Sequence, residues 1–206
     1  LKKKDSYTYL IMVILFFLSL TINNARIIGE NLNVLALKII TIIFNKSRRN
    51  GENMRDFEKI SFKQFCKDVT NNKELYDNYK LPVRDSKATA GYDIYLLEDL
   101  ELKPNEIVKL PTGIKAYFSD DEVLLVIIRS SMGFKYNIRL VNQVGVIDAD
   151  YYNNENNEGH IFIKIKNEGE NTVHFKAGQA IAQGIFFKYL TTESDNYLGQ
   201  TRTSDY

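Results

Sequence analysis

The stretch Ile161-Phe162-Ile163-Lys164-Ile165-Lys166 places isoleucine at every second position. Successive side chains of a β-strand point to opposite faces of a sheet, so this period of two predicts a strand with one buried face. On both sides of it the chain breaks into short runs rich in Ile, Val, Leu and Tyr, separated by turn residues such as Pro, Gly, Asn and Asp. These runs cover residues 93–97, 106–110, 113–118, 123–128, 172–175 and 181–189. Many short strands without helix-length periods between them predict an all-β sandwich or barrel.

The part that precedes these runs has a different pattern. We expect residues 54–80 to form a short lead-in to a β domain of residues 81–206. Four apolar residues recur near helical spacing within residues 55–70 and predict one short amphipathic helix there. They are Phe57, Ile60, Phe65 and Val69. Residues 71–80 are polar and carry tyrosine, so we expect an irregular connection.

The composition excludes several classes of protein. The 206 residues include 27 Lys and Arg against 26 Asp and Glu, which gives a net charge of +1, and 44% of them are hydrophobic. This balance argues against a protein held to nucleic acid mainly by charge. A single cysteine excludes an internal disulfide framework and a cysteine-rich zinc site. The fractions are those of an ordinary globular protein.

The near-neutral total is a sum of two unlike parts. Residues 1–53 carry eight basic and three acidic side chains, a net charge of +5. The remaining 19 basic and 23 acidic residues give residues 54–206 a net charge of −4. The predicted β domain is therefore acidic, and its overall field repels anions.

Residues 1–53 allow two interpretations. A basic start followed by the apolar run of residues 10–20 resembles a secretory signal or membrane anchor, although this run and residues 34–44 are both shorter than the roughly 20 residues of a spanning helix. The interpretation that we favour is an extension translated from upstream DNA. The chain opens with Leu1, and residues 48–53 can be encoded by purine-rich DNA like a ribosome-binding site directly before Met54. We therefore expect the functional chain to begin at Met54 and expect no membrane association from it.

Four polar clusters interrupt the predicted strands, at residues 90–95, 129–134, 141–151 and 177–183. The second cluster directly follows the apolar run of residues 123–128. It can present a cation, hydroxyl oxygens and close-packed backbone N–H groups together, which is what a phosphate chain requires. The residues concerned are Arg129, Ser130, Ser131 and Gly133. The alternative is an ordinary solvated strand end.

The third cluster contains a candidate proton acceptor. Asp148 ends an apolar run, and partial burial disfavours the charged form of a carboxylate and makes it a better base. Asn142 offers a donor and an acceptor to the edge of a nucleobase, and Gly145 permits close approach of the backbone. The alternative is that Asp148 and Asp150 simply cap a strand.

The first and fourth clusters are weaker signals. Gly91 precedes Tyr92 and Asp93, which can be a functional acid or merely a turn that enters a strand. Gln183 is a single polar residue in an apolar run, so we expect a buried hydrogen bond, either structural or directed at a ligand.

The order and spacing of these clusters resemble the trimeric dUTPase family from about residue 81 to the C-terminus. Arg-Ser-Ser-Met-Gly at residues 129–133 is followed by Asn-Gln-Val-Gly-Val-Ile-Asp-Ala-Asp-Tyr at residues 142–151. Residues 152–160 look like an insert found in branches of the family from Gram-positive bacteria and their phages. The resemblance implies a distorted jelly-roll or β-barrel, a homotrimer, and a cytoplasmic enzyme. It also implies that the enzyme hydrolyses dUTP to dUMP and pyrophosphate, which keeps uracil out of DNA and supplies dUMP for dTMP synthesis.

The same resemblance implies a role for each cluster. Asp148 would deprotonate the water that attacks the α-phosphorus, and Tyr151 would pack on the deoxyribose and exclude a 2′-hydroxyl. Asp93 would support the site from a neighbouring strand or subunit. The uracil would be read in a β-hairpin by Asn142 and the backbone of Gly145, Val146 and Ile147. The triphosphate would be held by Arg129, Ser130, Ser131, Gly133 and Gln183. Mg²⁺ would bind through the phosphates and water, without a dedicated set of protein ligands.

Two departures from the family pattern leave alternatives open. Ala180 stands where the family usually has Arg or Lys. At the C-terminus, Arg202 and Tyr206 supply a cation and an aromatic ring, but the glycines of the family's closing segment are replaced. This tail and the polar residues 153–158 favour, as an alternative, a catalytically weak regulatory relative. A related dCTP deaminase is disfavoured, because Lys164 stands where that enzyme needs a glutamate.

Overall fold

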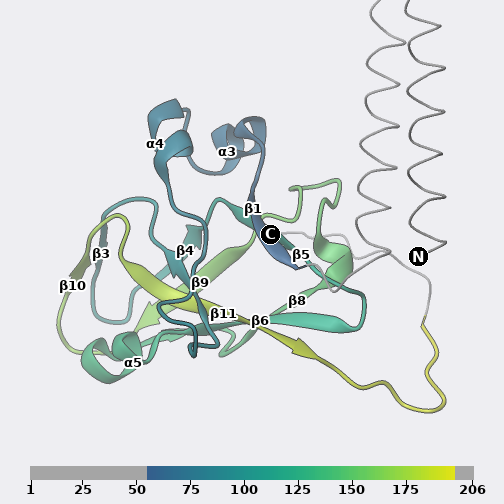
Figure 1. Ribbon diagram of the computed structural model, residues 1–206. Helices are drawn as coiled ribbons and strands as arrows, with labels where there is room; N and C mark the ends of the chain where they lie inside the picture. Colours follow the sequence, from purple (N-terminus) through teal and green to yellow (C-terminus); the bar gives the residue numbers. More distant parts are fainter. Residues whose placement is uncertain (1–54, 198–206) are drawn as a thin grey trace, which may run out of the picture. The chain divides into compact units, whose positions relative to one another are not determined.

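The computed structural model describes residues 55–197, and the last strand within this range lies inside the largest sheet (Figure 1). This strand, β11 (Ala180–Lys188), lies between β2 (Tyr92–Tyr95) and β6 (Glu122–Ile128). β6 also pairs with β8 (Gly145–Asp148), and every pairing in this sheet is antiparallel. The predicted strand at residues 181–189 is therefore confirmed as a central strand.

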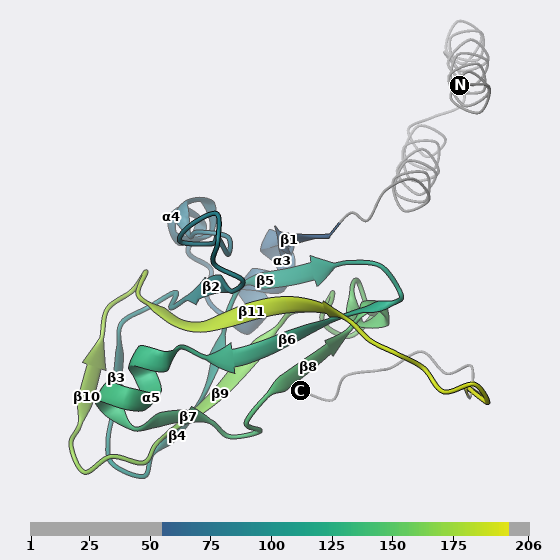
Figure 2. The ribbon, with the colours of Figure 1, turned by 60° about the horizontal axis from the view of Figure 1, so that its bottom comes forward.

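A second sheet lies below the first in Figure 2 and consists of β4 (Ile107–Pro111), β9 (Phe162–Asn167) and β7 (Ile138–Leu140). Two short ribbons complete the strands, β1 (Asp56–Lys59) with β5 (Ile114–Tyr117), and β3 (Leu100–Leu102) with β10 (Val173–Phe175). Both larger sheets contribute buried side chains to one apolar core, including Leu124 and Ile181 from the first and Ile165 from the second. The predicted all-β fold is confirmed.

The alternating stretch forms β9 with the expected burial. Ile163 and Ile165 are 3% and 0% exposed, whereas Lys164 between them is exposed. The isoleucines face the core, because the pleat turns every second side chain inward. β3 and β7, of three residues each, were not predicted, although the equally short β10 was.

The N-terminal part differs from the expected single helix. Residues 56–59 form β1, which pairs with β5, and the helix α3 (Phe62–Asp68) begins only after Ser61. Phe57 and Ile60 have helical spacing to Phe65, but they are buried from a strand and its end, so the spacing was a coincidence. The Ser61 side chain caps α3 by accepting a hydrogen bond from the Gln64 N–H, 3.1 Å away.

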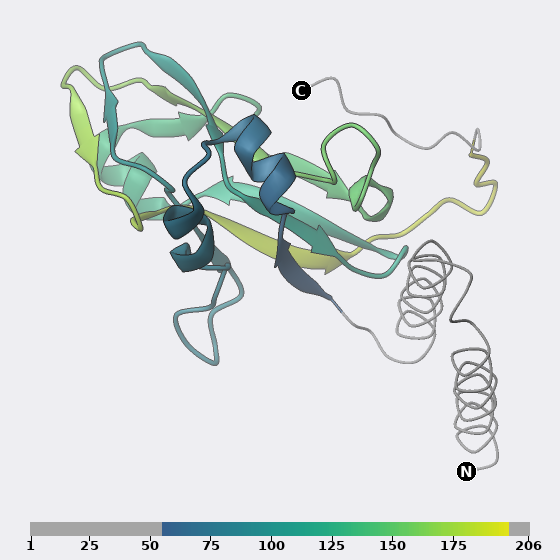
Figure 3. The same ribbon diagram turned by 90° about the horizontal axis from the view of Figure 1, so that it is seen from above.

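The expected irregular connection at residues 71–80 is also wrong, because it contains α4 (Lys73–Asn78). Asn72 caps this helix and accepts the Leu75 N–H at 3.0 Å. Figure 3 shows α3 and α4 side by side. Phe65 of α3 stacks on Tyr79, with ring centroids 5.5 Å apart, and both are part of a small apolar cluster. Residues 55–80 are therefore an integral part of the folded domain.

Two further helices follow strands in the polar clusters. α5 (Ser130–Tyr136) begins directly after Arg129, and the 3₁₀ turn η1 (Ala149–Tyr151) follows Asp148. Neither was predicted, because each is too short to show an apolar period. α5 begins at the predicted site residue Ser130, and η1 directly follows the predicted site residue Asp148.

The predicted insert packs against the N-terminal elements. Glu158 accepts hydrogen bonds from the Ser61 backbone N–H at 2.8 Å and from the Ser61 hydroxyl at 2.6 Å. His160 is fully buried, and its Nδ1 lies 2.7 Å from Oδ2 of Asp68 at the end of α3. Residues 152–160 are thus fixed to α3 at two points.

This buried histidine makes the stability depend on pH. Burial lowers the pKa of His160 below its ordinary value of about 6.5, with Asp68 opposing that change, Lys109 adding to it and Glu158 opposing it. Between the lowered pKa and about 6.5 the unfolded chain binds a proton that the folded chain does not. We therefore expect the free energy of unfolding to fall as the pH is lowered through about 6.5, measured by denaturant unfolding at several pH values.

The chain contains one other histidine, which provides the control. His174 is 67% exposed. His160→Gln should flatten the slope of unfolding free energy against pH between about 5.5 and 7, and His174→Gln should leave it unchanged. An equal slope in all three proteins would contradict this assignment.

Several expectations lie outside the described residues. They are the extension of residues 1–53, the start at Met54, and the closing segment with Arg202 and Tyr206. Between residues 55 and 197, no helix has the length and apolar character needed to cross a membrane.

Candidate functional site

The predicted phosphate-binding residues gather where β6 ends. Arg129 is the N-terminal flanking residue of α5, whose first turn contains Ser130 and Ser131. The Arg129 guanidinium donates a hydrogen bond of 2.7 Å to Asp93 on β2, and its other nitrogen lies 3.5 Å from Asp85. Arg129 and Asp93, 36 residues apart in sequence, are therefore brought together.

Burial and the ion pair act on Asp93 in opposite directions. The residue is 5% exposed, and burial raises the pKa of its carboxyl above the ordinary range, while the Arg129 guanidinium opposes that rise. The neighbouring Asp85 carboxylate adds to the rise. Asp93 thus orients Arg129, although the Asp93 carboxylate is itself partly desolvated. The Arg129 side chain remains 31% exposed to solvent.

Removing the cation from this pair should cost stability. In Arg129→Ala the buried Asp93 carboxylate loses its main partner, and we expect the free energy of unfolding to fall by about 3 kcal/mol, the lower end for a broken buried pair because Arg129 is itself partly exposed. The double variant Arg129→Ala/Asp93→Asn should recover most of this loss, because no buried charge remains. Denaturant unfolding of both variants measures the difference, and equal stability of the two would contradict it.

Gln183 of β11 lies beside the same pair. It is directly opposite Asp93 on β2 in the antiparallel register. Its side chain covers Gly91, because a Cβ added at Gly91 would stand 2.2 Å from Oε1 and 2.9 Å from Cδ of Gln183. Glycine at position 91 therefore leaves room for the end of the Gln183 side chain, which is a role that the sequence pattern did not identify. Gln183 is half-buried.

The predicted uracil-reading segment runs along the other edge of β6. The loop at residues 141–144 joins β7 to β8, which belong to different sheets, so these two strands do not form the paired hairpin that the resemblance implied. Asn142 is exposed, and the exposed Val146 alternates with the half-buried Gly145 and Ile147. A Cβ at Gly145 would stand 3.2 Å from Cβ of Val126, so glycine lets β8 approach β6 closely.

Asp148 and Tyr151 follow at the far end of β8. Asp148 ends the strand, directly opposite Val123 at the start of β6, and is half-buried as expected. Tyr151 belongs to η1, and its hydroxyl donates to the backbone oxygen of His160 at 3.0 Å. The predicted base and the predicted sugar-packing ring are thus three residues apart, on one 3₁₀ turn and its flank.

Within one chain, the structure separates the predicted phosphate-binding residue Arg129 from the predicted base Asp148. Arg129 follows the end of β6, whereas Asp148 faces Val123 near its beginning. Six residues of extended strand span roughly 20 Å, at about 3.3 Å per residue. Figure 2 shows α5 at one end of β6 and the end of β8 at the other. A general base must lie within hydrogen-bond reach of the proton that it accepts, directly or through one water, so Asp148 and Arg129 of the same chain cannot act on the same phosphate.

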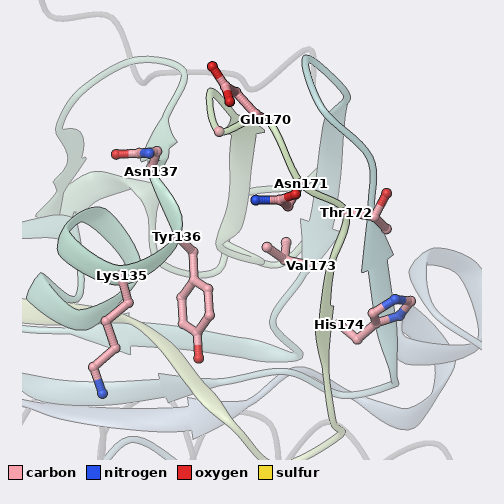
Figure 4. A pocket seen from close by; sticks show the side chains of 9 residues that line it. Lys135, Tyr136, Asn137, Glu170, Asn171, Thr172, Val173 and His174 are labelled. Carbon is pink, nitrogen blue, oxygen red and sulfur yellow. The ribbon is translucent and has the colours of Figure 1, made fainter.

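A separate hollow of about 390 Å³ lies between the C-terminal end of α5 and the segment of residues 169–174. Lys135 and His174 lie on opposite sides of it (Figure 4). None of the predicted site residues within residues 55–197 lines this hollow. The described part of the chain also contains no group of three or more His, Cys, Asp or Glu side chains that could hold a metal ion. The described residues of the predicted site form two clusters, one where β6 meets α5 and the other along β8 and η1.

Solved structures that resemble this fold include dUTPases, a class of nucleotide hydrolases. A crystal structure of dUTPase from Streptococcus mutans is 43% identical to this chain, with a TM-score of 0.55, and the match covers 67% of this chain and 98% of that one. A dUTPase from phage phi11 of S. aureus, solved to visualise its species-specific insert, is 22% identical with a TM-score of 0.54, over 71% of this chain and 97% of that one. The phage enzyme shares the fold.

Sequence relatives give the same result. The deoxyuridine 5′-triphosphate nucleotidohydrolase of Lactococcus lactis subsp. lactis is 41% identical over 139 residues, which are 65% of this chain and 93% of that protein. The enzyme of the same name from Mannheimia succiniciproducens is 32% identical over 130 residues, 62% of this chain and 82% of that protein. The dUTPase family model matches residues 77–205. The chain belongs to the dUTPase family, which confirms the resemblance drawn from the sequence.

Proposed function

We propose that this protein hydrolyses dUTP to dUMP and pyrophosphate, and thereby keeps uracil out of DNA and supplies dUMP for dTMP synthesis. Membership of the dUTPase family carries the proposal. The match of residues 77–205 contains every predicted site residue except Tyr206, including Asp93, Arg129, Asp148 and Gln183. The deaminase alternative lacks its base, since Lys164 occupies that position.

In the proposed reaction Asp148 accepts a proton from a water molecule as the water oxygen attacks the α-phosphorus. The bond from the α-phosphorus to the oxygen that bridges it to the β-phosphorus breaks, and pyrophosphate leaves with that oxygen. Arg129, Ser130, Ser131, Gly133 and Gln183 hold the phosphates. Arg129 supplies charge-assisted hydrogen bonds, and its orientation is fixed by Asp93 at 2.7 Å. Asn142 and the backbone of Gly145, Val146 and Ile147 read the uracil, and Tyr151 packs on the deoxyribose.

A complete site in this proposal requires more than one copy of the chain. Asp148 and Arg129 lie at opposite ends of β6, roughly 20 Å apart along the strand. A closed symmetric oligomer can bring the β8 edge of one subunit to the α5 end of the next and repeat this contact at every site. We propose the homotrimer that the family resemblance implies, with Arg202 and Tyr206 closing over the nucleotide.

We propose that Mg²⁺ binds to the phosphates of the substrate. Magnesium dehydrates reluctantly and commonly binds through substrate phosphates and retained water. The acidic side chains nearest the phosphate cluster, Asp85 and Asp93, are already paired with Arg129. When bound to the triphosphate, the ion neutralises charge that builds up as pyrophosphate leaves. A structure of a related phage enzyme describes a structural Mg(II) ion.

Release of pyrophosphate from dUTP by the full chain tests this function. We expect turnover with dUTP in the presence of Mg²⁺, much weaker turnover with UTP, dTTP and dCTP, and loss of most activity when EDTA removes the metal. Release of ammonia from dCTP would favour the deaminase. Binding of dUTP without turnover would favour the regulatory relative and contradict the proposed enzymatic function.

The proposed location is the cytoplasm, where nucleotides for DNA synthesis are held. We also propose that residues 1–53 contribute nothing to the site, since all predicted site residues lie between Asp93 and Tyr206. A chain that begins at Met54 retains β1 and should match the full chain in kcat and KM. Mass spectrometry of the native protein would locate its N-terminus, and an intact Leu1 would overturn the start at Met54.

A further inference from the structure

The insert makes polar contacts that the proposed reaction does not explain. Three of its side chains are almost completely buried although all three are polar, with Asn154 9%, Asn157 6% and His160 0% exposed. Buried polar groups are costly unless they are hydrogen-bonded, so a buried network of this kind specifies one geometry. The network ends on Tyr151.

The hydroxyl of Tyr151 is held from two directions. It donates to the backbone oxygen of His160 at 3.0 Å and accepts from Nδ2 of Asn157 at 2.9 Å. A phenolic hydroxyl has one proton to donate, and its direction is set here by the backbone oxygen. Gly159 lets the insert return this closely, because a Cβ there would stand 2.6 Å from the backbone oxygen of Tyr151, and its φ of +80° favours glycine.

Asn157 is in turn fixed by its own neighbours. Its Oδ1 accepts from the Gly159 N–H at 3.0 Å and from Nδ2 of Asn154 at 2.8 Å. With the oxygen so occupied, the amide nitrogen of Asn157 is directed at the Tyr151 hydroxyl. The orientation of the amide follows from these partners.

The other end of the network is fixed to α3 through His160. The Gly113 N–H donates to Nε2 at 2.9 Å, so Nε2 carries no proton, and Nδ1 carries the proton and donates to Asp68 at 2.7 Å. Asp68 also accepts from Nε2 of Gln64 at 2.7 Å. α3 lies before the residues 77–205 that the family model matches.

From these contacts we infer that the insert and α3 position the ring of Tyr151 and so set the preference of the site for deoxyribose over ribose. Asn157, His160 and Asp68 are positioning residues, since they act through Tyr151. The inference rests on the proposed function, in which Tyr151 packs on the sugar. A ring that is held at its hydroxyl cannot move away to admit a 2′-hydroxyl, and looser anchoring weakens this discrimination more than it slows the chemical step.

The test compares dUTP with UTP in the full chain. Asn157→Asp keeps the size and the accepting oxygen but removes the donor to Tyr151. We expect the ratio of kcat/KM for dUTP to that for UTP to fall about 2- to 10-fold, the effect of one lost hydrogen bond, with KM for dUTP raised and kcat nearly unchanged. Glu155→Gln, at an exposed position of the same insert, is the matched control and should leave the ratio unchanged.

A second pair of variants tests the remote end of the network. Asp68→Ala removes the acceptor for His160 and should lower the same ratio, whereas Asp68→Asn retains an accepting oxygen and should restore it. Thermal unfolding identifies the variants that are folded at the assay temperature. An unchanged ratio in folded Asn157→Asp and Asp68→Ala overturns the inference, as does a fall in kcat for dUTP and UTP alike.

Failure of the proposed function would be recognised separately. The dUTP analogue dUpNHpp and its ribonucleotide counterpart can be compared by calorimetry. The ratio of their binding affinities gives the preference for deoxyribose over ribose without turnover. A wild-type chain that prefers dUpNHpp but does not hydrolyse dUTP contradicts the proposed function. The positioning network is then tested by the binding preference of the same variants. A wild-type chain that binds both analogues equally overturns the inference.

Discussion

Asp148→Asn is expected to lower kcat for dUTP by about 10²- to 10⁴-fold, the usual contribution of a positioned general base. The substitution removes the proton acceptor and keeps the size of the side chain at the end of β8. The Kd for dUpNHpp should therefore stay within a few-fold of the wild-type value. Single-turnover pyrophosphate release and calorimetry measure the two quantities.

The sequence supplies a matched control two residues away. Asp150 follows Ala149 in the same turn but is exposed, whereas Asp148 is half-buried. Asp150→Asn removes the same charge and should retain nearly full turnover. Equal losses in the two variants would show that the charge of the turn matters and that Asp148 is not the base.

Mixed oligomers should recover activity from two inactive chains. Asp148→Asn lacks the proposed base, and Asp93→Asn/Arg129→Gln lacks the proposed phosphate-binding cation without leaving a buried charge. When each site combines Asp148 of one subunit with Arg129 of the next, every mixed trimer contains one site with both intact. We expect about a third of wild-type activity in mixed trimers, from two proteins that are each nearly inactive.

Co-expression with two different affinity tags, followed by purification on both, isolates the mixed species. Mixing the purified parent proteins without subunit exchange is the control and should give no recovery. If doubly tagged oligomers form but remain inactive, Asp148 of one subunit does not act together with Arg129 of the next. The separation of roughly 20 Å between these two residues along β6 would then need another explanation.

The sequence predicted those parts of the fold that have a local signal. β9 followed from the alternation of Ile163, Lys164 and Ile165, and its burial is a direct result of the pleat. The N-terminal helix was misjudged because Phe57 and Ile60 have the spacing of a helix, whereas residues 56–59 form β1, which pairs with β5 about 60 residues further on. Such long-range pairing overrides local periodicity and leaves no local signal.

For the candidate site, the sequence predicted which residue types occur together but not their distances. The approach of Asp93 to Arg129 depends on β2 and β6 flanking β11, and the separation of Asp148 from Arg129 depends on the register between β6 and β8. The role of Asp85 and the room that Gly91 gives Gln183 also arise from tertiary contacts. The catalytic roles themselves stay predictions until the variants are measured.

The central position of β11 governs when this protein can fold during its synthesis. β11 is the last strand among residues 55–197, yet it pairs on one side with β2 and on the other with β6. The ribosome must therefore release nearly the whole domain before the largest sheet can close, and until then β2 and β6 present unpaired edges. Contacts so distant in sequence make folding slow, in the range of milliseconds to seconds. Until that point the unpaired edges of β2 and β6 can pair with other chains.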